Sequence, residues 1–102
     1  MRVAALIALP LAFVASAADP AAGRAKAAAC AVCHGQAGIS TLPNAPHLAG
    51  QPVVYLEEQL RNYRSGKRQH EQMSLVARSL SDADIGELAA WYASIRIEAT
   101  PP

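Results

Sequence analysis

The sequence predicts a small all-α domain packed around a bulky apolar group that is not one of its own side chains. No alternation of apolar and polar residues with period two extends beyond a few positions, so strands are not expected. Two segments in the second half of the chain carry apolar residues three and four positions apart, which is typical of helices. The 102 residues include one Trp, one Phe and three Tyr, too few to fill the core of an alanine-rich chain. We therefore expect helices joined by loops around an additional apolar group.

Residues 1–18 have the pattern of a secretory signal peptide. A basic residue follows the initiator Met, residues 3–14 form an apolar run, and small residues at 15–18 suit cleavage. The run of about 12 residues is shorter than the ~20 needed to span a bilayer, so no stable membrane insertion is expected after cleavage. Cleavage before Asp19, or one residue earlier, leaves 19–102 as a single exported domain, which predicts a periplasmic protein.

A first helix is expected to begin at Asp19, which can cap it, with Pro20 in the first helical position. It continues through alanine-rich sequence to residue 29 and reaches the cysteines that follow. Residues 35–51 then hold three Gly and two Pro in a polar setting, too many for a regular element. A loop of this length is uncommon in a small domain unless it is functional, so we expect it to wrap around and pack on something.

Two further helices are expected. One opens at Pro52 and ends at Ser65, before Gly66, with apolar residues spaced by three, four and three: Val53, Leu56, Leu60 and Tyr63. The other has Ser81 as its N-cap, Asp84 as the reciprocal partner, and a hydrophobic staple of Leu80 and Ile85. Its core face comprises Ile85, Leu88, Ala89, Tyr92 and Ile95, with Trp91 beside it. Between these helices, 67–73 is expected to form a polar loop and 74–79 a short helical turn.

The charge balance argues against nucleic acid as a partner. Nine Lys and Arg face eight Asp and Glu, a formal net charge of +1. Nucleic-acid binding needs a basic excess that neutralises phosphates, and the chain has none. The basic residues that gather around the exit of the helix after Pro52 are Arg61, Arg64, Lys67 and Arg68. They are interpreted as a solvated face, or alternatively as a patch that steers an acidic partner.

The motif Cys30-Ala31-Val32-Cys33-His34 points to the chemistry of the protein. Two cysteines three positions apart at the end of a helix lie on one side of it, where both sulfurs can reach the vinyl groups of one haem. The histidine that follows can present its imidazole to the iron. C-x-x-C-H is the attachment motif of c-type haem, which predicts one covalently bound haem c held by Cys30 and Cys33, with His34 on the iron.

Other uses of C-x-x-C fit less well. A thioredoxin-like site needs a βαβ setting, and a structural zinc site usually needs four ligands, whereas the chain has two Cys. A disulfide between Cys30 and Cys33 stays open as an alternative, because an exported chain meets oxidising surroundings.

Met73 is the expected second ligand of the iron. A Met ligand raises the reduction potential of an electron-carrying haem, and Met73 is the only Met left after signal cleavage. It is expected in the irregular stretch between two helices, from which its side chain can lie over the haem. The alternatives are that Met73 only fills the core, and that His70 or, more remotely, His47 is the ligand.

The chain resembles the class I cytochrome c family, above all the small bacterial monohaem type of cytochrome c-553 and of a single domain of cytochrome c4. The resemblance covers essentially the whole mature sequence. It rests on stretches in a fixed order, among them CAVCHG at 30–35, PHLAGQ at 46–51, SGKR at 65–68, LSDADI at 80–85 and LAAWY at 88–92. It implies the cytochrome c fold: three main helices, short helical turns and long loops wrapped around one covalently attached haem.

The resemblance also implies two contacts. Gly23 of the first helix would cross the last helix at Trp91, where a glycine lets the two backbones approach. The carbonyl of Pro46 would accept a hydrogen bond from the second ring nitrogen of His34, which fixes the imidazole. Ala27 departs from the family, since many members have an aromatic residue there, so a thinner crossing is expected.

Further residues are expected to surround the haem. The apolar walls are predicted to be Leu48, Leu56, Leu60, Leu75, Val76, Leu88 and Trp91. Arg68 is expected to pair with a haem propionate, or to belong to the basic patch.

The function predicted from these features is one-electron transfer between a donor and an acceptor redox protein that dock transiently, without enzymatic activity. One alternative is a haem c subunit or docked module of a larger exported oxidoreductase. The other is a haem peroxidase or gas-binding protein with an open sixth position on the iron.

Overall fold

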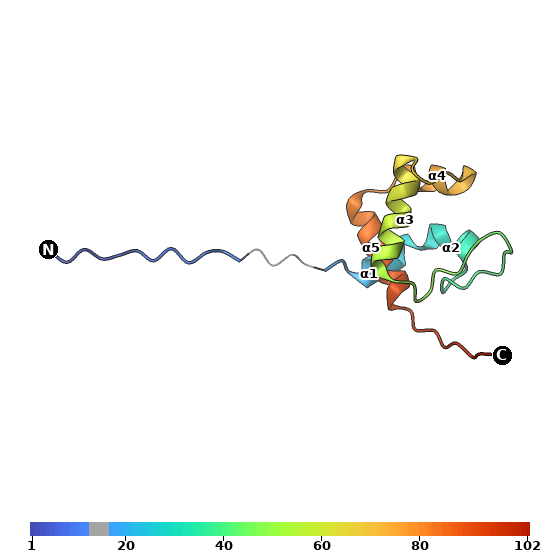
Figure 1. The fold of residues 1–102 in the computed structure, drawn as a ribbon, viewed down its shortest axis with the longest axis horizontal. Helices are drawn as coiled ribbons and strands as arrows, with labels where there is room; N and C mark the ends of the chain where they lie inside the picture. Colours follow the sequence, from blue (N-terminus) through green and yellow to red (C-terminus); the bar gives the residue numbers. More distant parts are fainter. Residues whose placement is uncertain (13–16) are drawn as a thin grey trace.

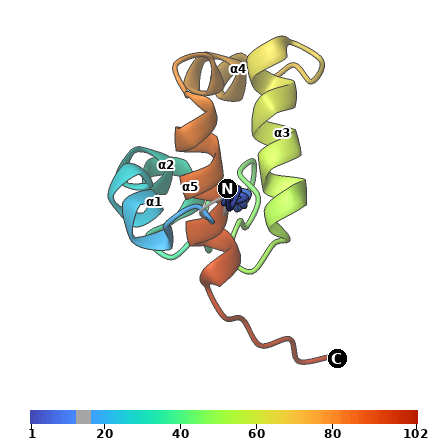
Figure 2. The same cartoon turned by 90° about the vertical axis from the view of Figure 1, so that its left-hand side faces the viewer.

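The computed structural model describes residues 1–12 and 17–102, and within these ranges it contains five α-helices and no strand (Figure 1). The helices are α1 (Pro20–Lys26), α2 (Ala28–His34), α3 (Val53–Ser65), α4 (Glu71–Arg78) and α5 (Asp82–Ser94). In Figure 2, α5 runs between α1 and α3, and α4 lies across the upper end of the pair α3 and α5. The predicted all-α class is confirmed.

The first predicted helix is divided in two. Asp19 caps α1 as expected, because its Oδ1 accepts a hydrogen bond of 2.9 Å from the N–H of Ala21. The chain then turns at the buried Ala27, whose carbonyl accepts a 3.0 Å hydrogen bond from the N–H of Cys30. The prediction of one continuous helix to residue 29 was wrong, because no Gly or Pro marks the turn in the sequence.

Helix α1 crosses α5 at Gly23, as the resemblance implied. A Cβ on Gly23 would lie 1.9 Å from the carbonyl oxygen of Glu87 and 2.8 Å from the Cβ of Trp91. Across the same contact, the ammonium group of Lys26 pairs with Asp84 at 2.6 Å and with Glu87. Because α2 follows α1 directly, this contact between α1 and α5 also positions the start of α2, which carries the C-x-x-C-H motif.

Helices α3 and α5 follow the prediction closely. Helix α3 starts one residue later than expected, with Pro52 at its N-cap. It ends at Ser65 as expected, and its C-cap is Gly66, which has a left-handed φ of 85°. The reciprocal capping of α5 is present: the Ser81 hydroxyl accepts from the N–H of Asp84 at 3.0 Å, and the Asp84 carboxylate accepts from the N–H of Ser81 at 2.9 Å. The expected core face of α5 is buried at Ile85, Leu88, Ala89 and Tyr92, with Ile95 half-buried at the C-cap.

The segment before α5 differs from the prediction. Residues 71–78 form a complete helix, α4, instead of a polar loop followed by a short turn. Its N-cap is His70, whose Nδ1 accepts hydrogen bonds of 3.2 Å from the N–H groups of Gln72 and Met73. Histidine is not among the residues preferred at this position, so the sequence carried no ordinary start signal. Met73 is therefore on a helix and not in an irregular stretch.

The long connection 35–51 has no helix or strand and folds back onto the core, as predicted. The N–H groups of Leu48 and Ala49 both donate to the carbonyl of Gly38, at 2.8 and 3.1 Å. Gly50 donates to the carbonyl of Tyr92 on α5 at 2.9 Å. The first two bonds close the loop on itself, and the third holds it against the C-terminal end of α5.

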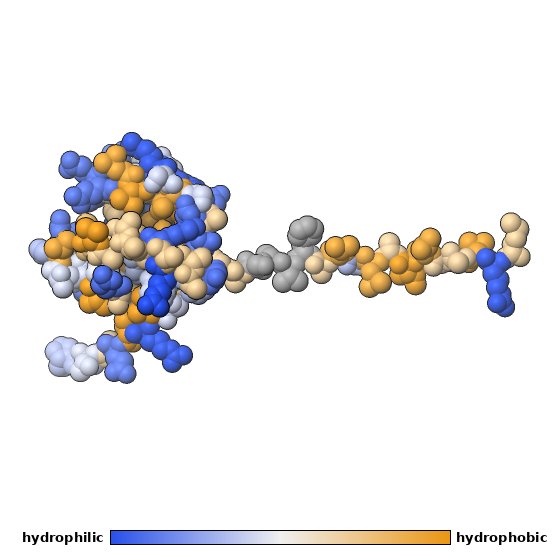
Figure 3. Space-filling model, turned by 180° about the vertical axis from the view of Figure 1, so that it is seen from behind, coloured by the Kyte–Doolittle hydropathy of each residue, from blue (hydrophilic) through white to orange (hydrophobic). Residues whose placement is uncertain are grey.

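The N-terminal residues 1–12 contain no helix and form a mostly apolar extended segment that points away from the folded part (Figure 3). Residues 13–16, which include part of the predicted cleavage segment, lie outside the described residues. Among the helices in the described ranges, none is long and apolar enough to cross a membrane.

Candidate functional site

The C-x-x-C-H motif forms the last part of α2. Cys30 and Cys33 lie one helical turn apart, and both are free, half-buried thiols. The alternative of a disulfide between them is not formed in the structure. A zinc site finds no support either, because no three His, Cys, Asp or Glu side chains of the described residues are grouped as metal ligands.

The imidazole of His34 is buried and held in one orientation. The residue is 7% exposed, and its Nδ1 lies 2.9 Å from the carbonyl oxygen of Pro46. Because a carbonyl only accepts hydrogen bonds, Nδ1 carries the proton, and Nε2 keeps a lone pair that can bind a metal. The hydrogen bond implied by the resemblance is present. The hydrogen bond and the burial thus fix the orientation of the ring so that Nε2 is available as a ligand.

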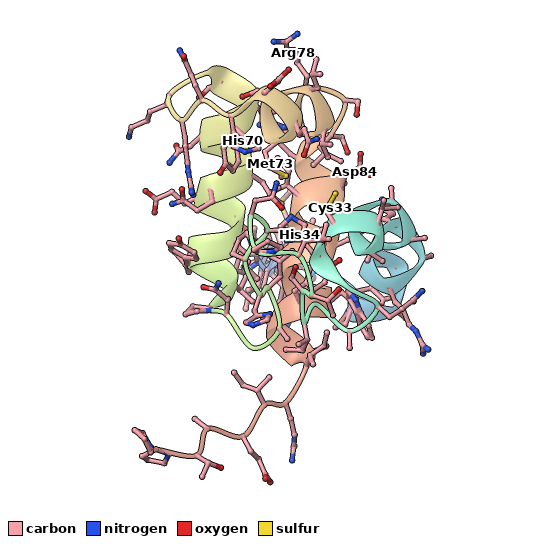
Figure 4. All side chains as sticks on the ribbon, turned by 90° about the vertical axis from the view of Figure 1, so that its right-hand side faces the viewer. Cys33, His34, His70, Met73, Arg78 and Asp84 are labelled. Carbon is pink, nitrogen blue, oxygen red and sulfur yellow. The ribbon has the colours of Figure 1, made fainter. Side chains whose placement is uncertain are left out.

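Met73 reaches the same region from the opposite side. In Figure 4 it comes from α4 in the upper part of the view, whereas His34 and Cys33 come from α2 below. Met73 is the third residue of α4 and is half-buried, whereas Glu71 and Gln72 before it are exposed. The Met73 thioether is thus partly buried on α4, while the His34 imidazole is buried at the end of α2.

The two rival histidines are exposed and occupied by local hydrogen bonds. The Nδ1 of His70 accepts from the backbone of α4, and that of His47 accepts from the N–H of Ser40 at 2.8 Å. Each ring therefore stabilises the loop or helix end on which it lies.

A hollow of about 460 Å³ opens beside Cys30. It lies between the motif, α4 and α5, and its lining includes Cys30, Val76, Leu80 and Leu88. Of the predicted walls, Leu56 and Leu88 are buried, while Leu48, Leu60 and Trp91 are half-buried and pack against the same core. Leu75 is 61% exposed, and its expected place in the pocket wall stays a prediction.

Arg68 has partners within the chain. Its guanidinium is 4.7 Å from the centre of the Tyr63 ring and donates to the side chain of Gln59 at 2.9 Å. Arg64 pairs with Asp82 at 2.6 Å. Arg61 contacts Glu57 at 3.4 Å, so three of the four residues of the predicted basic cluster have partners within the protein, which favours its interpretation as a solvated face.

Tyr92 is a residue of the site that the sequence did not reveal. Its side chain is buried beside the Cys30 thiol, and among the described residues its hydroxyl has no hydrogen-bond partner. Burial raises the pKa of Tyr92, and the nearby thiol raises it further. Burial also raises the pKa of the Cys30 thiol. The sequence placed Tyr92 on the core face of α5 but held no signal for its proximity to Cys30, which depends on the tertiary fold.

These residues fit a covalently attached haem. Two free thiols on one helix face can bond the vinyl groups, a fixed imidazole and a thioether can bind the iron, and a mostly apolar hollow adjoins Cys30. A buried hydroxyl without a partner beside one thiol is consistent with a group that is still to be bound there. Fold and site together define a small all-α haem c domain.

Comparison with known proteins agrees. Residues 20–96 match the family model of cytochrome c. The chain is 47% identical over 79 residues to cytochrome c4 of Pseudomonas aeruginosa, covering 78% of this chain and 39% of that protein. It is 42% identical over 79 residues to cytochrome c-554(548) of Halomonas halodenitrificans, covering 74% of this chain and 95% of that protein. The chain belongs to the cytochrome c family of electron-transfer haem proteins, and its cofactor is covalently attached haem c.

Two further similarities bear on the organisation of the relatives. The crystal structure of reduced cytochrome c4 from Pseudomonas stutzeri superposes with a TM-score of 0.74 at 37% identity, covering 78% of this chain and 47% of that one. A thiosulfate dehydrogenase electron acceptor of Thiomonas intermedia is 39% identical over 102 residues, covering 98% of this chain and 46% of that protein. The chain thus spans less than half the length of most of these relatives.

Proposed function

We propose that this chain is a one-electron carrier of the periplasm with His34 and Met73 as the two axial ligands of its haem iron. Cys30 and Cys33 hold the haem through thioether bonds. When bound, the haem supplies an iron centre that alternates between the ferric and ferrous states. The observation that carries the proposal is the buried His34 ring, whose Nδ1 is held by Pro46 and whose Nε2 is therefore available as a ligand.

The surrounding residues set the properties of the site. The carbonyl of Pro46 orients the His34 ring and increases its basicity. The apolar side chains of Leu48, Leu60 and Trp91 help to exclude water. A dry pocket with a Met ligand favours the less charged ferrous state, so we expect a positive reduction potential. Arg68 as a partner of a haem propionate stays a prediction, because its present partners are Tyr63 and Gln59.

Export follows from the same proposal, since residues 1–18 have the pattern of a signal peptide and 19–102 that of one domain. Mass spectrometry of the protein purified from the periplasm of an expressing bacterium should show a chain that begins at Asp19 or one residue earlier, plus one haem. A full-length chain in the membrane fraction would contradict this part of the proposal.

An optical spectrum tests the ligands. The full chain is expressed in a bacterium with c-type haem maturation, and the oxidised protein is purified. We expect an intense haem band that resists acid–acetone extraction and a weak far-red band from the sulfur-to-iron bond. Met73→Ala should abolish the far-red band, and the control His70→Asn, which removes the imidazole but keeps an acceptor at the cap of α4, should keep it.

Other spectra would support a different iron ligand or a different function. A covalent haem without the far-red band in the parent protein would indicate ligation by His70 or an open sixth position. Binding of carbon monoxide to the reduced parent protein would indicate an open sixth position, as in a peroxidase or gas sensor. A protein that acquires no haem would refute the proposed function altogether.

A second candidate is a haem module that docks on a larger oxidoreductase. It is favoured by the 39% identity to a thiosulfate dehydrogenase electron acceptor, which extends over 98% of this chain. The reduced haem band can be followed after the oxidised protein is mixed with a thiosulfate dehydrogenase and thiosulfate. Rapid reduction, together with co-purification of the two proteins at high salt, would support this candidate; a complex that dissociates at high salt would favour the diffusible carrier.

A further inference from the structure

Tyr92 combines deep burial with an unpaired polar group. The residue is 3% exposed, and no hydrogen-bond partner for its hydroxyl is found among the described residues. A buried hydroxyl that lacks a partner loses its hydrogen bonds to water without replacement, which destabilises the fold. A phenylalanine would fill the same space without this penalty, so the hydroxyl calls for a physical explanation.

The loop 35–51 packs against both the ring and the backbone of Tyr92. Its ring atoms Cδ1 and Cε1 lie 2.8 and 3.0 Å from the position that a Cβ on Gly38 would occupy. Its carbonyl accepts a hydrogen bond from the N–H of Gly50 at 2.9 Å. Loop 35–51 therefore holds both the ring and the backbone of Tyr92 in place.

Cys30 is the polar neighbour of this hydroxyl. Cys30 packs against the core cluster that includes Tyr92, and each of the two side chains shifts the pKa of the other. The Tyr92 hydroxyl lowers the pKa of the Cys30 thiol, opposing the larger effect of burial, and Cys30 raises the pKa of Tyr92 beyond what burial alone does. The phenol thus stays protonated and acts as a donor.

We propose that the Tyr92 hydroxyl donates a hydrogen bond to the sulfur of Cys30 in the haem-loaded protein, and that Tyr92 is a positioning residue that raises the reduction potential. The inference rests on the proposed function. A thioether sulfur has no proton of its own and only accepts, so a fixed donor complements it. A hydrogen bond to this sulfur withdraws electron density from the porphyrin, which favours the ferrous state, as hydrogen bonding near a haem generally tunes its potential.

The test compares two deletions of a hydroxyl in the haem-loaded protein. Tyr92→Phe removes the proposed donor, and Tyr55→Phe removes the hydroxyl of a Tyr that is 44% exposed on α3. Midpoint potentials come from spectroelectrochemical titration, and stability comes from guanidinium denaturation. We expect Tyr92→Phe to lower both the potential and the denaturation midpoint, and Tyr55→Phe to change neither. A potential of Tyr92→Phe that equals or exceeds that of the parent overturns the proposal, whichever way its stability changes.

A double-mutant cycle identifies the partner. In a Cys30→Ala background, where Cys33 alone attaches the haem, Tyr92→Phe should no longer shift the potential. A shift of the same size in both backgrounds would place the partner of the hydroxyl elsewhere and overturn the assignment. Failure of the proposed function is recognised separately, because the parent protein would then show no covalent haem before any variant is made.

Discussion

At Gly23, a single hydrogen atom in place of a side chain allows two helices to touch. A Cβ there would lie 1.9 Å from the carbonyl oxygen of Glu87 and 2.8 Å from the Cβ of Trp91. Both atoms belong to the rigid part of α5, so neither can move aside as the end of a flexible side chain could. Any larger residue must push α1 away from α5, and with it the start of the haem-binding motif.

Gly23→Ala should therefore destabilise the protein by about 1–3 kcal/mol, the usual cost of overpacking, or more. The matched control is Gly86→Ala on α5, where the nearest neighbour of an added Cβ is the Cβ of Ala18 at 3.5 Å. Alanine there fits and should stabilise the helix by about 0.5–1 kcal/mol. Guanidinium denaturation of the haem-loaded proteins measures both, and equal effects would contradict the structure.

Asp84 predicts a dependence of stability on pH. The Lys26 ammonium, followed by the N–H and hydroxyl of Ser81, lowers the pKa of Asp84 from 3.8 to about 2. Because the pKa is lower in the folded state, the stabilisation is present above the unfolded value near pH 4 and is lost as the pH falls to about 2. Asp84→Asn should reduce the loss of stability between pH 4 and 2, whereas Glu98→Gln on the exposed tail should not. Identical acid denaturation curves for Asp84→Asn and the parent would contradict this expectation.

Among the elements, α4 depends most clearly on one side chain. His70 caps it through two backbone hydrogen bonds, and one of them comes from Met73, the proposed ligand. The helix has eight residues, so its first turn is a large part of it. A loss of the cap affects the element that carries the thioether.

His70→Ala should destabilise the haem-loaded protein by about 1 kcal/mol, as is typical of a lost N-cap. His70→Asn keeps an acceptor at the cap and should recover most of this loss. Thermal or guanidinium denaturation followed by the haem absorbance gives the comparison. If both variants are as stable as the parent protein, His70 does not hold the start of α4.

The elements also show what sequence reasoning could reach. Helix α5 was predicted because its capping pair and apolar spacing are local signals, and the same holds for α3. The turn at Ala27 and the helix that begins after His70 were missed, because tertiary packing sets the first and an unusual cap sets the second.

The residues of the site likewise comprise some that the sequence could predict and one that it could not. Cys30, Cys33 and His34 were found because their spacing along one helix is itself the signal. The hydrogen bond between His34 and Pro46 came from the family resemblance, since it joins residues twelve positions apart. The role of Tyr92 could not be found, because it exists only where α5 meets α2 in the folded chain.

For the whole molecule, the thin core is the decisive property. Among the described residues, the buried apolar side chains are four alanines, three larger aliphatic residues and one tyrosine: Ala27, Ala49, Ala77, Ala89, Leu56, Ile85, Leu88 and Tyr92. Of these, Ile85 is the largest side chain with an exposure below 2%. A hollow of about 460 Å³ adjoins Cys30, at the place where the haem is proposed to attach. Such a core supplies little of the burial that a small domain needs, so the cofactor should provide the remainder.

A chain that cannot attach haem should therefore fail to fold. The double variant Cys30→Ser/Cys33→Ser removes both attachment points while changing little else. The two single variants test whether one thioether bond is enough to hold the haem and sustain the fold. Far-UV circular dichroism of the double variant should show much less helix than the haem-loaded parent, and heating should give no cooperative transition. The physical reason is that apolar side chains left facing an empty pocket lose the burial that offsets the entropy of ordering the chain. Native helix content with a sharp unfolding transition in the double variant would show that the protein side chains alone sustain the fold, contrary to the composition of its core.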